Sequence, residues 1–230
     1  MSDSSEPGDR DGRAAGLPTH ALAPLARPEP MRVRVESALR ELIISRQVQP
    51  GEHLTEQDLA RRLSVSRQPV REALQALERE GWVDLHVGRG AFVHEPTANE
   101  VDQVFAVRGA LEAEAARLAC PNVDAAAAEV LTGIIRDGWA ALEGSHDVVL
   151  VDANARFHRQ IAALAGNAVL LGFLEALDQR IRWYFTPLAR VRGADSWKEH
   201  ERILDALHRD EPGRAAELMR QHTENTRAAY

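Results

Sequence analysis

Residues 54–81 read LTEQDLARRLSVSRQPVREALQALEREG, a stretch that predicts two short amphipathic helices joined by a tight turn. Thr55 precedes the first helix, expected over residues 56–63, as an N-cap whose side chain can accept a hydrogen bond from a free amide. Ser66 has the same place before the second helix, expected over residues 68–80, in which apolar residues recur every three or four positions. The rest of the chain is organised around this helix pair.

The polar face of the second helix starts with four side chains near its N-terminus: Ser66, Arg67, Gln68 and Arg71. A recognition helix that enters a DNA major groove presents its side chains at this end. An arginine fork can grip guanine or phosphate, and a serine hydroxyl beside helix N-terminal amides suits a phosphate. The alternative for these two helices alone is a helical hairpin with a solvated basic face.

The residues after the second helix predict a short β-hairpin. Residues 82–87 alternate like a strand, residues 88–90 (GRG) make a tight turn, and residues 91–93 return as a second strand. A helix pair followed at once by a hairpin is a winged helix-turn-helix, and Arg89 then lies at the wing tip, near a minor groove or a phosphate. An upstream helix over residues 31–47 carries apolar residues at helical spacing and closes the small core.

Residues 31–95 resemble the DNA-binding domain of the GntR family of bacterial transcription regulators, through PGEHLTEQDLARRLSVSRQPVREALQALEREGWV and the HVGRGAFV that comes after it. At the matching positions, the resemblance implies DNA contacts from these residues: Ser66, Arg67, Gln68, Pro69, Arg71 and, at the wing, Gly88. Arg34 on the upstream helix is a further candidate for a phosphate contact. The implied partner is a double-stranded DNA operator.

The composition of the 230-residue chain is that of a soluble globular protein with room for two modest domains. No apolar run is long enough to span a membrane. Residues 1–30 are rich in Ser, Asp, Gly, Ala and Pro without sustained periodicity, which predicts a disordered tail. The single cysteine, Cys120, excludes an intramolecular disulfide and fits a reducing cytoplasm.

The net charge of −7 neither supports nor excludes binding to nucleic acid. Residues 31–95 hold ten arginines and ten acidic residues, so this region is neutral overall. A local cluster at Arg67, Arg71 and Arg89 suffices for operator recognition, even in a chain that is acidic as a whole.

From residue 97 onward the pattern predicts only helices, joined by short connections into an antiparallel bundle. Six are expected, over residues 97–119, 123–142, 148–165, 168–190, 196–208 and 212–228. Capping boxes are expected to open the first helix at Thr97 and the fifth at Ser196. The expected apolar stripe of the first helix consists of Val101, Val104, Val107, Leu111 and Leu118. The residues expected to be buried on the second helix are Val130, Leu131, Ile134 and Ile135.

Four polar residues of the bundle can converge. Asn154 and His158 are four residues apart and therefore share one helix face. An antiparallel hairpin of the last two helices brings His200 and His222 to a similar height. Three neutral imidazoles from three helices can hold Zn²⁺ or a similar divalent ion and leave positions open. Taken singly, each histidine is more often a surface residue or a hydrogen-bonded polar residue.

Residues 101–225 resemble the FCD ligand-binding domain, through VFAVRGALEAEAARLA, NARFHRQIAALAGNAVL, EHERILDAL and AELMRQH. In metal-binding members the ligands are an Asp or Asn four residues before the FH histidine and two later histidines. The resemblance therefore implies a divalent ion, Zn²⁺ or else Ni²⁺ or another, held by Asn154, His158, His200 and His222. A neutral amide at Asn154 is a weaker ligand than a carboxylate, and it leaves the site more positive, which favours a bound anion.

Arg108 has two open interpretations. It lies on the first bundle helix among apolar neighbours, where it can pair with Glu112 one turn further on. The resemblance implies instead that Arg108 points into the bundle cavity near the metal and binds the carboxylate of an effector.

The sequence thus predicts a mainly α protein: a disordered tail over residues 1–30, a winged helix-turn-helix DNA-binding domain over 31–95, and an all-α antiparallel bundle for ligand binding and dimerisation over 96–230. The expected function is a cytoplasmic, homodimeric transcription regulator, most often a repressor, that binds a palindromic operator and senses a small carboxylate through a metal-containing cavity. The alternatives are a DNA-binding regulator with a metal-free effector bundle, and a three-histidine metalloenzyme. No carboxylate is clearly placed as the general base of an enzyme.

Overall fold

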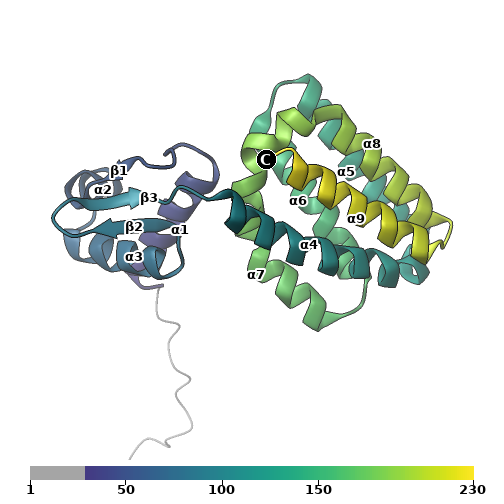
Figure 1. The fold of residues 1–230 in the computed structure, drawn as a ribbon, viewed down its shortest axis with the longest axis horizontal. Coiled ribbons are helices and arrows are strands. Elements are labelled where there is room, and N and C mark those ends of the chain that lie inside the picture. The colour runs from purple at the N-terminus through teal and green to yellow at the C-terminus, as the bar shows by residue number, and fades with distance from the viewer. Residues whose placement is uncertain (1–28) are drawn as a thin grey trace, which may run out of the picture. The chain divides into compact units, whose positions relative to one another are not determined.

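The computed structural model describes residues 29–230, so the disordered tail predicted for residues 1–30 lies, apart from its last two residues, outside the described part. Figure 1 shows a small group of helices with a three-stranded sheet near the N-terminal end, followed along the chain by a bundle of helices. The mainly α fold, with a winged helix-turn-helix before a helical bundle, is confirmed.

Three helices form the winged helix: α1 (Met31–Ile44), α2 (Glu56–Leu63) and α3 (Arg67–Arg79). The Thr55 side chain accepts a hydrogen bond from the Asp58 amide, as predicted for an N-cap. Ser66 has the extended backbone of an N-cap, but its side chain makes no capping hydrogen bond. The recognition helix α3 begins one residue earlier than the sequence pattern predicts.

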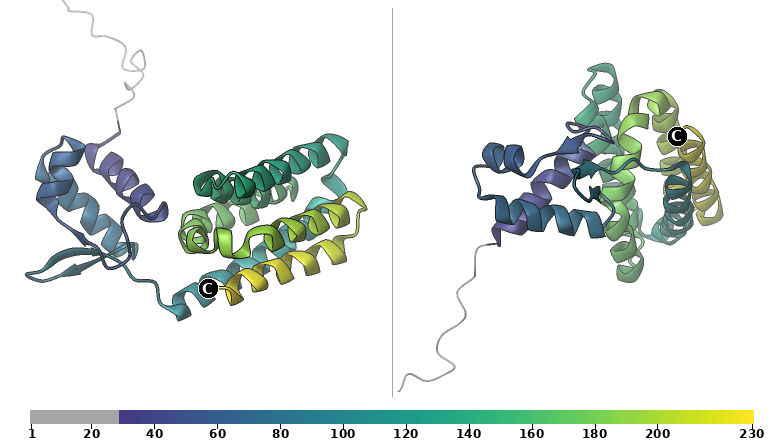
Figure 2. Two further views of the ribbon diagram at one scale, coloured as in Figure 1. Left: turned by 90° about the horizontal axis from the view of Figure 1, so that it is seen from above. Right: turned by 60° about the vertical axis from the view of Figure 1, so that its left-hand side comes forward.

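The small sheet is antiparallel, with the order β1-β3-β2 for strands β1 (His53–Leu54), β2 (Val83–His86) and β3 (Gly90–Val93). Its β2–β3 hairpin is the predicted wing, and Figure 2 shows it projecting from the three helices. The wing turn contains Gly88 with φ of +73°, a conformation that glycine adopts at little cost because it lacks a Cβ atom.

The apolar faces of α1 and α3 close one core with the inner face of the sheet. Its buried residues recur three or four positions apart on the helices and alternate on the strands: Val35, Leu39, Ile43, Val70, Leu74, Leu77, Val83, Ala91 and Val93. Burial of this apolar face fixes the rotation of α3, which leaves the opposite, polar face of the helix in solvent.

The bundle consists of α4 (Ala98–Ala119), α5 (Ala125–Glu143), α6 (Asp147–Leu164), α7 (Ala168–Phe185), α8 (Ala189–His208) and α9 (Pro212–Ala228). Short 3₁₀ segments, Cys120–Asn122 and Thr186–Leu188, follow α4 and α7. The helix α4 packs along α9, and α5 packs against α6 and α8 (Figures 1 and 2). Within residues 29–230, no helix is both long and apolar enough to cross a membrane.

A close approach of α5 to α8 depends on Gly138. A Cβ atom added at Gly138 would lie 2.2 Å from the ring of Trp197, a side chain that is itself buried. Glycine inside a helix normally lowers helix stability. Here it makes room for a large aromatic side chain, so the packing of α5 against α8 compensates for the weak helix former.

The fifth helix of the bundle starts earlier than the sequence predicted. Ser196 and Glu199 have the spacing of a capping box, yet α8 spans Ala189–His208, with a non-helical break at Gly193 (φ +37°, ψ −126°), so the helical segment that contains Ser196 begins before it. Ser196 is buried inside this helix, and Glu199 accepts hydrogen bonds from side chains of α9. The capping-box prediction at Ser196 is wrong because Ser196 already lies inside the helical segment, and because Arg192 and side chains of α9 bind the Glu199 carboxylate that was expected to cap.

The buried face of α4 also differs from the predicted stripe. Val107 is 51% exposed, whereas Phe105, Arg108 and Glu112 are buried. A charged pair can replace apolar residues on a buried helix face when the two charges neutralise each other one turn apart, and a pattern of apolar residues does not register this. On α5, Val130 is likewise 49% exposed although it was expected in the core.

Candidate functional site

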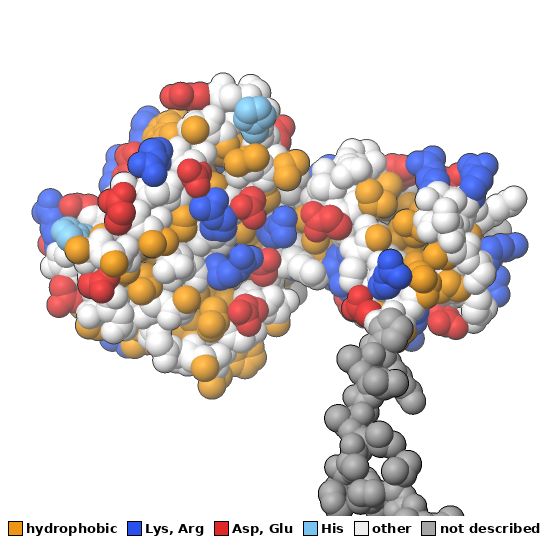
Figure 3. Space-filling model, turned by 180° about the vertical axis from the view of Figure 1, so that it is seen from behind, with side chains coloured by type: hydrophobic (Ala, Val, Ile, Leu, Met, Phe, Trp, Pro, Cys, Tyr) orange, Lys and Arg blue, Asp and Glu red, His pale blue; other side chains and the backbone are white. Residues whose placement is uncertain are grey.

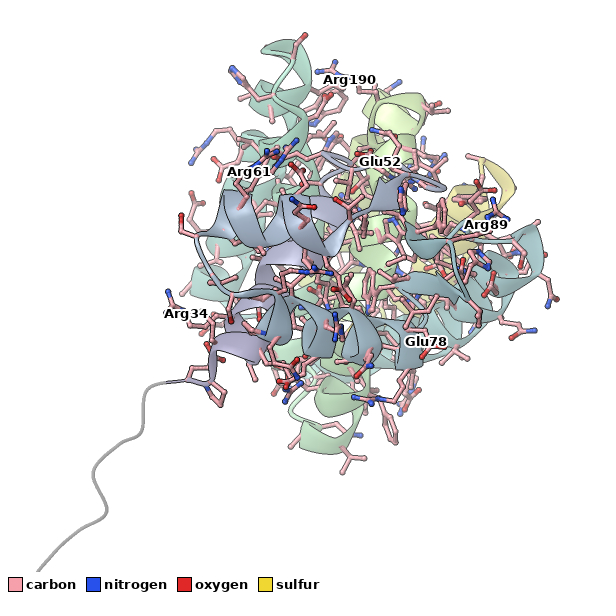
Figure 4. The ribbon with its side chains drawn as sticks, turned by 90° about the vertical axis from the view of Figure 1, so that its left-hand side faces the viewer. Arg34, Glu52, Arg61, Glu78, Arg89 and Arg190 are labelled. Atoms are coloured by element: carbon pink, nitrogen blue, oxygen red, sulfur yellow. The ribbon has the colours of Figure 1, made fainter. Side chains whose placement is uncertain are left out.

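The side chains predicted to contact DNA lie at the start of α3 and on the wing. At the start of α3, four of these side chains are exposed: Ser66, Arg67, Gln68 and Arg71. Pro69, between them, is half-buried. Arg89 is exposed in the hairpin turn, with its guanidinium 5.7 Å from the centroid of the Phe92 ring. Figure 4 shows Arg34 on α1 and Arg89 on the wing at opposite sides of the winged helix.

A groove separates α3 from the wing. Its lining includes Arg67 and Arg71 on one side and His86 and Val87 of the hairpin on the other. Figure 3 shows Lys and Arg side chains along the outer edge of the winged helix, with some acidic side chains on the same part, and acidic and basic side chains intermingled over the visible face of the bundle. That the arginines at the start of α3 and on the wing suffice for phosphate contacts stays a prediction.

Glu56, the first residue of α2, binds both arginines of the recognition helix. Its carboxylate accepts two hydrogen bonds from Arg71, at 2.8 and 2.9 Å, and one from Arg67, at 2.9 Å. These bonds lower the pKa of Glu56 to about 2, with the Arg71 hydrogen bond as the main cause. In the described structure, the forks that could grip guanine or phosphate are therefore held by a carboxylate.

The three bundle histidines converge from three helices. The ligand atoms of His158 on α6, His200 on α8 and His222 on α9 all lie within 4.8 Å of one another, and the three side chains are buried. The Nε2 atoms of His200 and His222 are 3.3 Å apart. Phe157 stacks on the His200 ring with 4.2 Å between ring centroids, which fixes the plane of this imidazole.

Two carboxylates contact the outer nitrogens of this cluster. The Nδ1 atom of His222 lies 2.8 Å from Oε2 of Glu199, in hydrogen-bonding geometry. The Nδ1 atom of His158 lies 3.1 Å from Oε2 of Glu112, although neither ring nitrogen of His158 makes a well-aligned hydrogen bond. Carboxylates in this position commonly orient histidines that bind metal through their other nitrogen.

Burial keeps the three imidazoles neutral. It lowers the pKa of His158 and lowers that of His200 well below its ordinary value, and it lowers the pKa of His222 to about 4 even though Glu199 opposes the shift. Burial alone would raise the pKa of Glu112, but the positive charge of Arg108 and the contact with His158 outweigh it and hold that pKa below its usual range. At neutral pH the cluster thus offers unprotonated nitrogens beside an ionised carboxylate.

Arg108 and Asn154 face a cleft beside the histidines. The cleft lies between α6 and α7, has α4 at its inner end, and encloses about 520 Å³ including its open mouth. Arg108 is 1% exposed, and its Nε atom donates to Glu112 at 3.0 Å, which is the structural pairing that the sequence left open. Among the described groups, the buried Nη1 atom of Arg108, Oδ1 of Asn154 and Nε2 of His158 have no hydrogen-bond partner.

The cluster passes a simple test of fit for a metal ion. Two imidazole nitrogens bound to one tetrahedral Zn²⁺ lie roughly 3.3–3.4 Å apart, given Zn–N distances of about 2.0–2.1 Å. The Nε2 atoms of His200 and His222 are 3.3 Å apart, which matches this separation. The buried Nε2 atom of His158 and Oδ1 atom of Asn154 have no hydrogen-bond partner and could complete the set of ligands. This donor set of three neutral imidazoles and one amide oxygen suits a divalent ion of the first transition series.

Sequence reasoning missed three carboxylates that contact the candidate residues. Glu56 precedes Arg67 and Arg71 by more than two helical turns, so no periodic spacing links them. Glu112 was considered only as a partner of Arg108, and Glu199 only as part of a capping box. Each of the three contacts crosses between helices, so it depends on helix packing and not on spacing along one helix.

Comparisons with known proteins connect both regions with regulators. The model "bacterial regulatory proteins, gntR family" matches residues 31–93, and the FCD domain model matches residues 103–225. A probable D-xylose utilization operon transcriptional repressor from Paenarthrobacter nicotinovorans is 30% identical over 207 residues, 86% of this chain and 88% of that protein. The HTH-type transcriptional regulator YdhC of Bacillus subtilis is 26% identical over 186 residues, 80% of this chain and 83% of that protein. A GntR transcriptional regulator from Rhodococcus sp. RHA1 has the same fold, with a TM-score of 0.73 and 24% identity over 86% of this chain and 95% of that chain.

Proposed function

Because this chain belongs to the gntR family of bacterial regulatory proteins and carries an FCD domain, we propose that it represses transcription from a palindromic operator until a small carboxylate binds its bundle. The coarser statement follows from the family itself: the chain is a DNA-binding transcription regulator, and its relatives are regulators, not enzymes. Repression is the activity named for the relative from Paenarthrobacter nicotinovorans. The proposed location is the cytoplasm, where the operator is.

The observation that carries the proposal is the convergence of three buried, neutral imidazoles on one point. His158, His200 and His222 would hold a divalent ion, Zn²⁺ or Ni²⁺, with Asn154 as the fourth protein ligand. The unpaired Oδ1 atom of Asn154 supports this assignment, since a buried oxygen without a partner is costly unless something binds it. When bound, the ion supplies positive charge and open coordination positions to which a carboxylate is attracted.

The charge of the surrounding residues supports an anionic effector. The imidazoles and Asn154 are neutral, and the buried charges of Arg108 and Glu112 cancel. A divalent ion would therefore leave about two positive charges in a low-dielectric site, where an anion is far more stable than water. The unpaired Nη1 atom of Arg108 faces the same cleft and can donate to a carboxylate while Nε stays on Glu112.

A metal-free bundle is the second candidate, and one contact favours it. If the Nδ1–H group of His222 donates to Glu199, its Nε2 atom is unprotonated and can accept a hydrogen bond from Nε2–H of His200 at 3.3 Å. The same two histidines would then stabilise the bundle through a hydrogen-bonded chain. Metal content separates the two candidates directly.

Native and denaturing mass spectrometry of the purified chain is the deciding experiment. We expect a native mass that exceeds the denatured mass by one divalent ion per chain, and no such difference in a protein with His158, His200 and His222 all changed to Gln. A matched control changes two exposed histidines, His146 and His208, and should keep the ion. A wild-type chain that takes up neither Zn²⁺ nor Ni²⁺ after incubation would establish the metal-free candidate.

Dimerisation belongs to the proposal because one recognition helix reads only one half-site, and a two-fold axis doubles the contacts with a palindrome. Sedimentation of the chain with DNA carrying one or two half-sites tests this. We expect two chains on the full operator and much weaker binding to the single half-site. One chain on the full operator would contradict the dimer.

A further inference from the structure

The cleft beside the histidines has an apolar wall between two polar ends. The wall is formed mainly by aliphatic and aromatic side chains of α6 and α7, among them Val151, Leu171, Leu174, Ile181 and Phe185. A ligand whose head reaches the inner end must lay its body along this wall. The wall therefore determines which chemical groups are favourable in the part of the ligand that lies outside the inner end, whatever binds the group at the inner end.

The inner end is built for a charged or strongly polar head. Arg108, Asn154 and His158 are buried there, and each has a side-chain atom without a hydrogen-bond partner among the described groups. Such atoms in a buried site are stable only when a ligand or water satisfies them. A carboxylate can accept from Arg108 and bind the ion proposed for the histidines.

The mouth carries two positive and two negative side chains. Arg159 on α6 lies 3.4 Å from Asp178 on α7, so each offsets the charge of the other. Glu175 and Arg182 complete the rim with one charge of each sign. A second carboxylate on the effector would therefore meet the two negative charges of Glu175 and Asp178 beside the two arginines at this end.

Neutral hydrogen-bonding side chains are nearly missing from the cleft. Of the lining residues, all of which lie in the described part of the chain, none is Ser, Thr, Tyr or Gln, and Asn154 is the one neutral amide. A hydroxyl placed against Leu174 or Ile181 would lose its hydrogen bonds to water without replacement, which strongly disfavours binding. A methylene group placed there gains about four-fold in affinity, from the usual transfer free energy of a CH₂ group.

We propose that the effector is a monocarboxylate with an apolar body, an aliphatic or aromatic acid, and not a sugar acid or another polyhydroxylated acid. This inference rests on the proposed function, since it assumes that an effector carboxylate binds at the inner end. It adds the chemical class of the rest of the molecule, which the charge of the site does not determine.

Calorimetric titration of the full chain, loaded with Zn²⁺, with butanoate, hexanoate and gluconate tests the inference at fixed pH and salt. Hexanoate should bind roughly 15-fold more tightly than butanoate, because it buries two more methylene groups, and gluconate should bind more weakly than either. Gluconate that binds as tightly as hexanoate overturns this inference and leaves the proposed function standing. If none of the three acids binds, the proposed effector site itself fails.

A pair of leucine variants shows whether the apolar wall is responsible. Leu171→Asn places a polar group on the wall, and Leu204→Asn changes a similarly half-buried leucine of α8 that does not line the cleft. We expect Leu171→Asn to reduce the ratio of hexanoate to butanoate affinity clearly below the roughly 15-fold expected for the wild type, and Leu204→Asn to leave it unchanged. Equal ratios in the two variants would mean that the hydrocarbon chain does not lie along this wall.

Discussion

The two functional regions of this molecule both pair arginine with glutamate, but in opposite surroundings. On the winged helix, Arg71 and Glu56 have side chains that are 49% and 25% exposed. In the bundle, Arg108 and Glu112 have side chains that are 1% and 5% exposed. The atoms are at similar distances in the two pairs, 2.8 and 3.0 Å, so distance does not separate them.

The difference in burial determines what each pair can do. An ion pair in contact with solvent is worth little, because water and salt replace either partner easily. The pair on the winged helix can therefore open when a phosphate or a base takes the place of Glu56. A buried pair cannot open without leaving a charge unpaired in a low dielectric, so Arg108 and Glu112 form a fixed part of the bundle.

Removal of one buried partner should have the largest effect. Glu112→Ala leaves the buried charge of Arg108 without a counter-charge, and we expect a loss of about 3–5 kcal/mol in the free energy of unfolding. Urea unfolding of the metal-free protein, followed by tryptophan fluorescence, measures this loss. Glu56→Ala is the matched control and should change stability by less than about 1 kcal/mol. Similar losses in both variants would show that burial does not distinguish the two pairs.

Removal of the recognition arginines should be the next largest effect, on DNA binding alone. The operator for this test is one selected from random DNA. Arg67→Ala combined with Arg71→Ala should lower the affinity for it, by roughly 5- to 150-fold for each base contact that is lost in a half-site. The fold should survive, since both side chains are exposed. Fluorescence anisotropy at fixed salt measures the affinity, and unfolding midpoints check the fold. Unchanged operator affinity would contradict the assignment of α3 as the recognition helix.

Acid should weaken the bundle before it affects the winged-helix pair. Since the pKa of His222 is about 4 when folded and near 6.5 when unfolded, the unfolded chain binds more protons between these values, and stability falls as pH falls. From pH 7 to 5, His222 alone should reduce the free energy of unfolding of the metal-free protein by about 2 kcal/mol. Glu56, with a pKa of about 2, stays ionised throughout this interval.

Unfolding by urea at pH 7, 6 and 5 in the presence of a chelator measures this slope. A protein with His158, His200 and His222 changed to Gln provides the control, because it lacks the titrating groups and should show a flatter dependence. An equal slope in the two proteins would assign the acid sensitivity to groups outside the cluster.

The smallest effect is expected where Glu56 competes with DNA. Glu56→Gln removes a negative charge that holds Arg67 and Arg71, so both guanidiniums become freer to meet phosphates. We expect non-operator DNA to bind a few-fold more tightly at low salt, a change within the roughly 1 kcal/mol typical of exposed ion pairs. Operator affinity should rise less, so the ratio of operator to non-operator affinity falls. Equal gains for both kinds of DNA would show that Glu56 does not contribute to discrimination.

Several features of the candidate site depended on contacts that spacing does not encode. The spacing of Asn154 and His158, and the hairpin of the last two helices, predicted correctly that His158, His200 and His222 could meet. The carboxylates beside them were not predicted, because Glu199 reaches His222 from α8 and Glu112 reaches His158 from α4. The rotation of one helix against another decides such contacts.

By itself, the sequence determined the winged helix and the identity of its exposed residues, because the signals are local. Each signal spans only a few residues: the N-cap at Thr55, the apolar repeat of α3 and the glycine turn of the wing. The apolar repeat also places Arg67 and Arg71 on the opposite, polar face of α3. Only the tertiary structure decided that Arg108 and Glu112 lie inside the bundle, that Val107 faces solvent and that Ser196 starts no helix. The physical reason is that a helix with apolar residues on more than one face can bury either, and the free energy of packing against its neighbours selects between them.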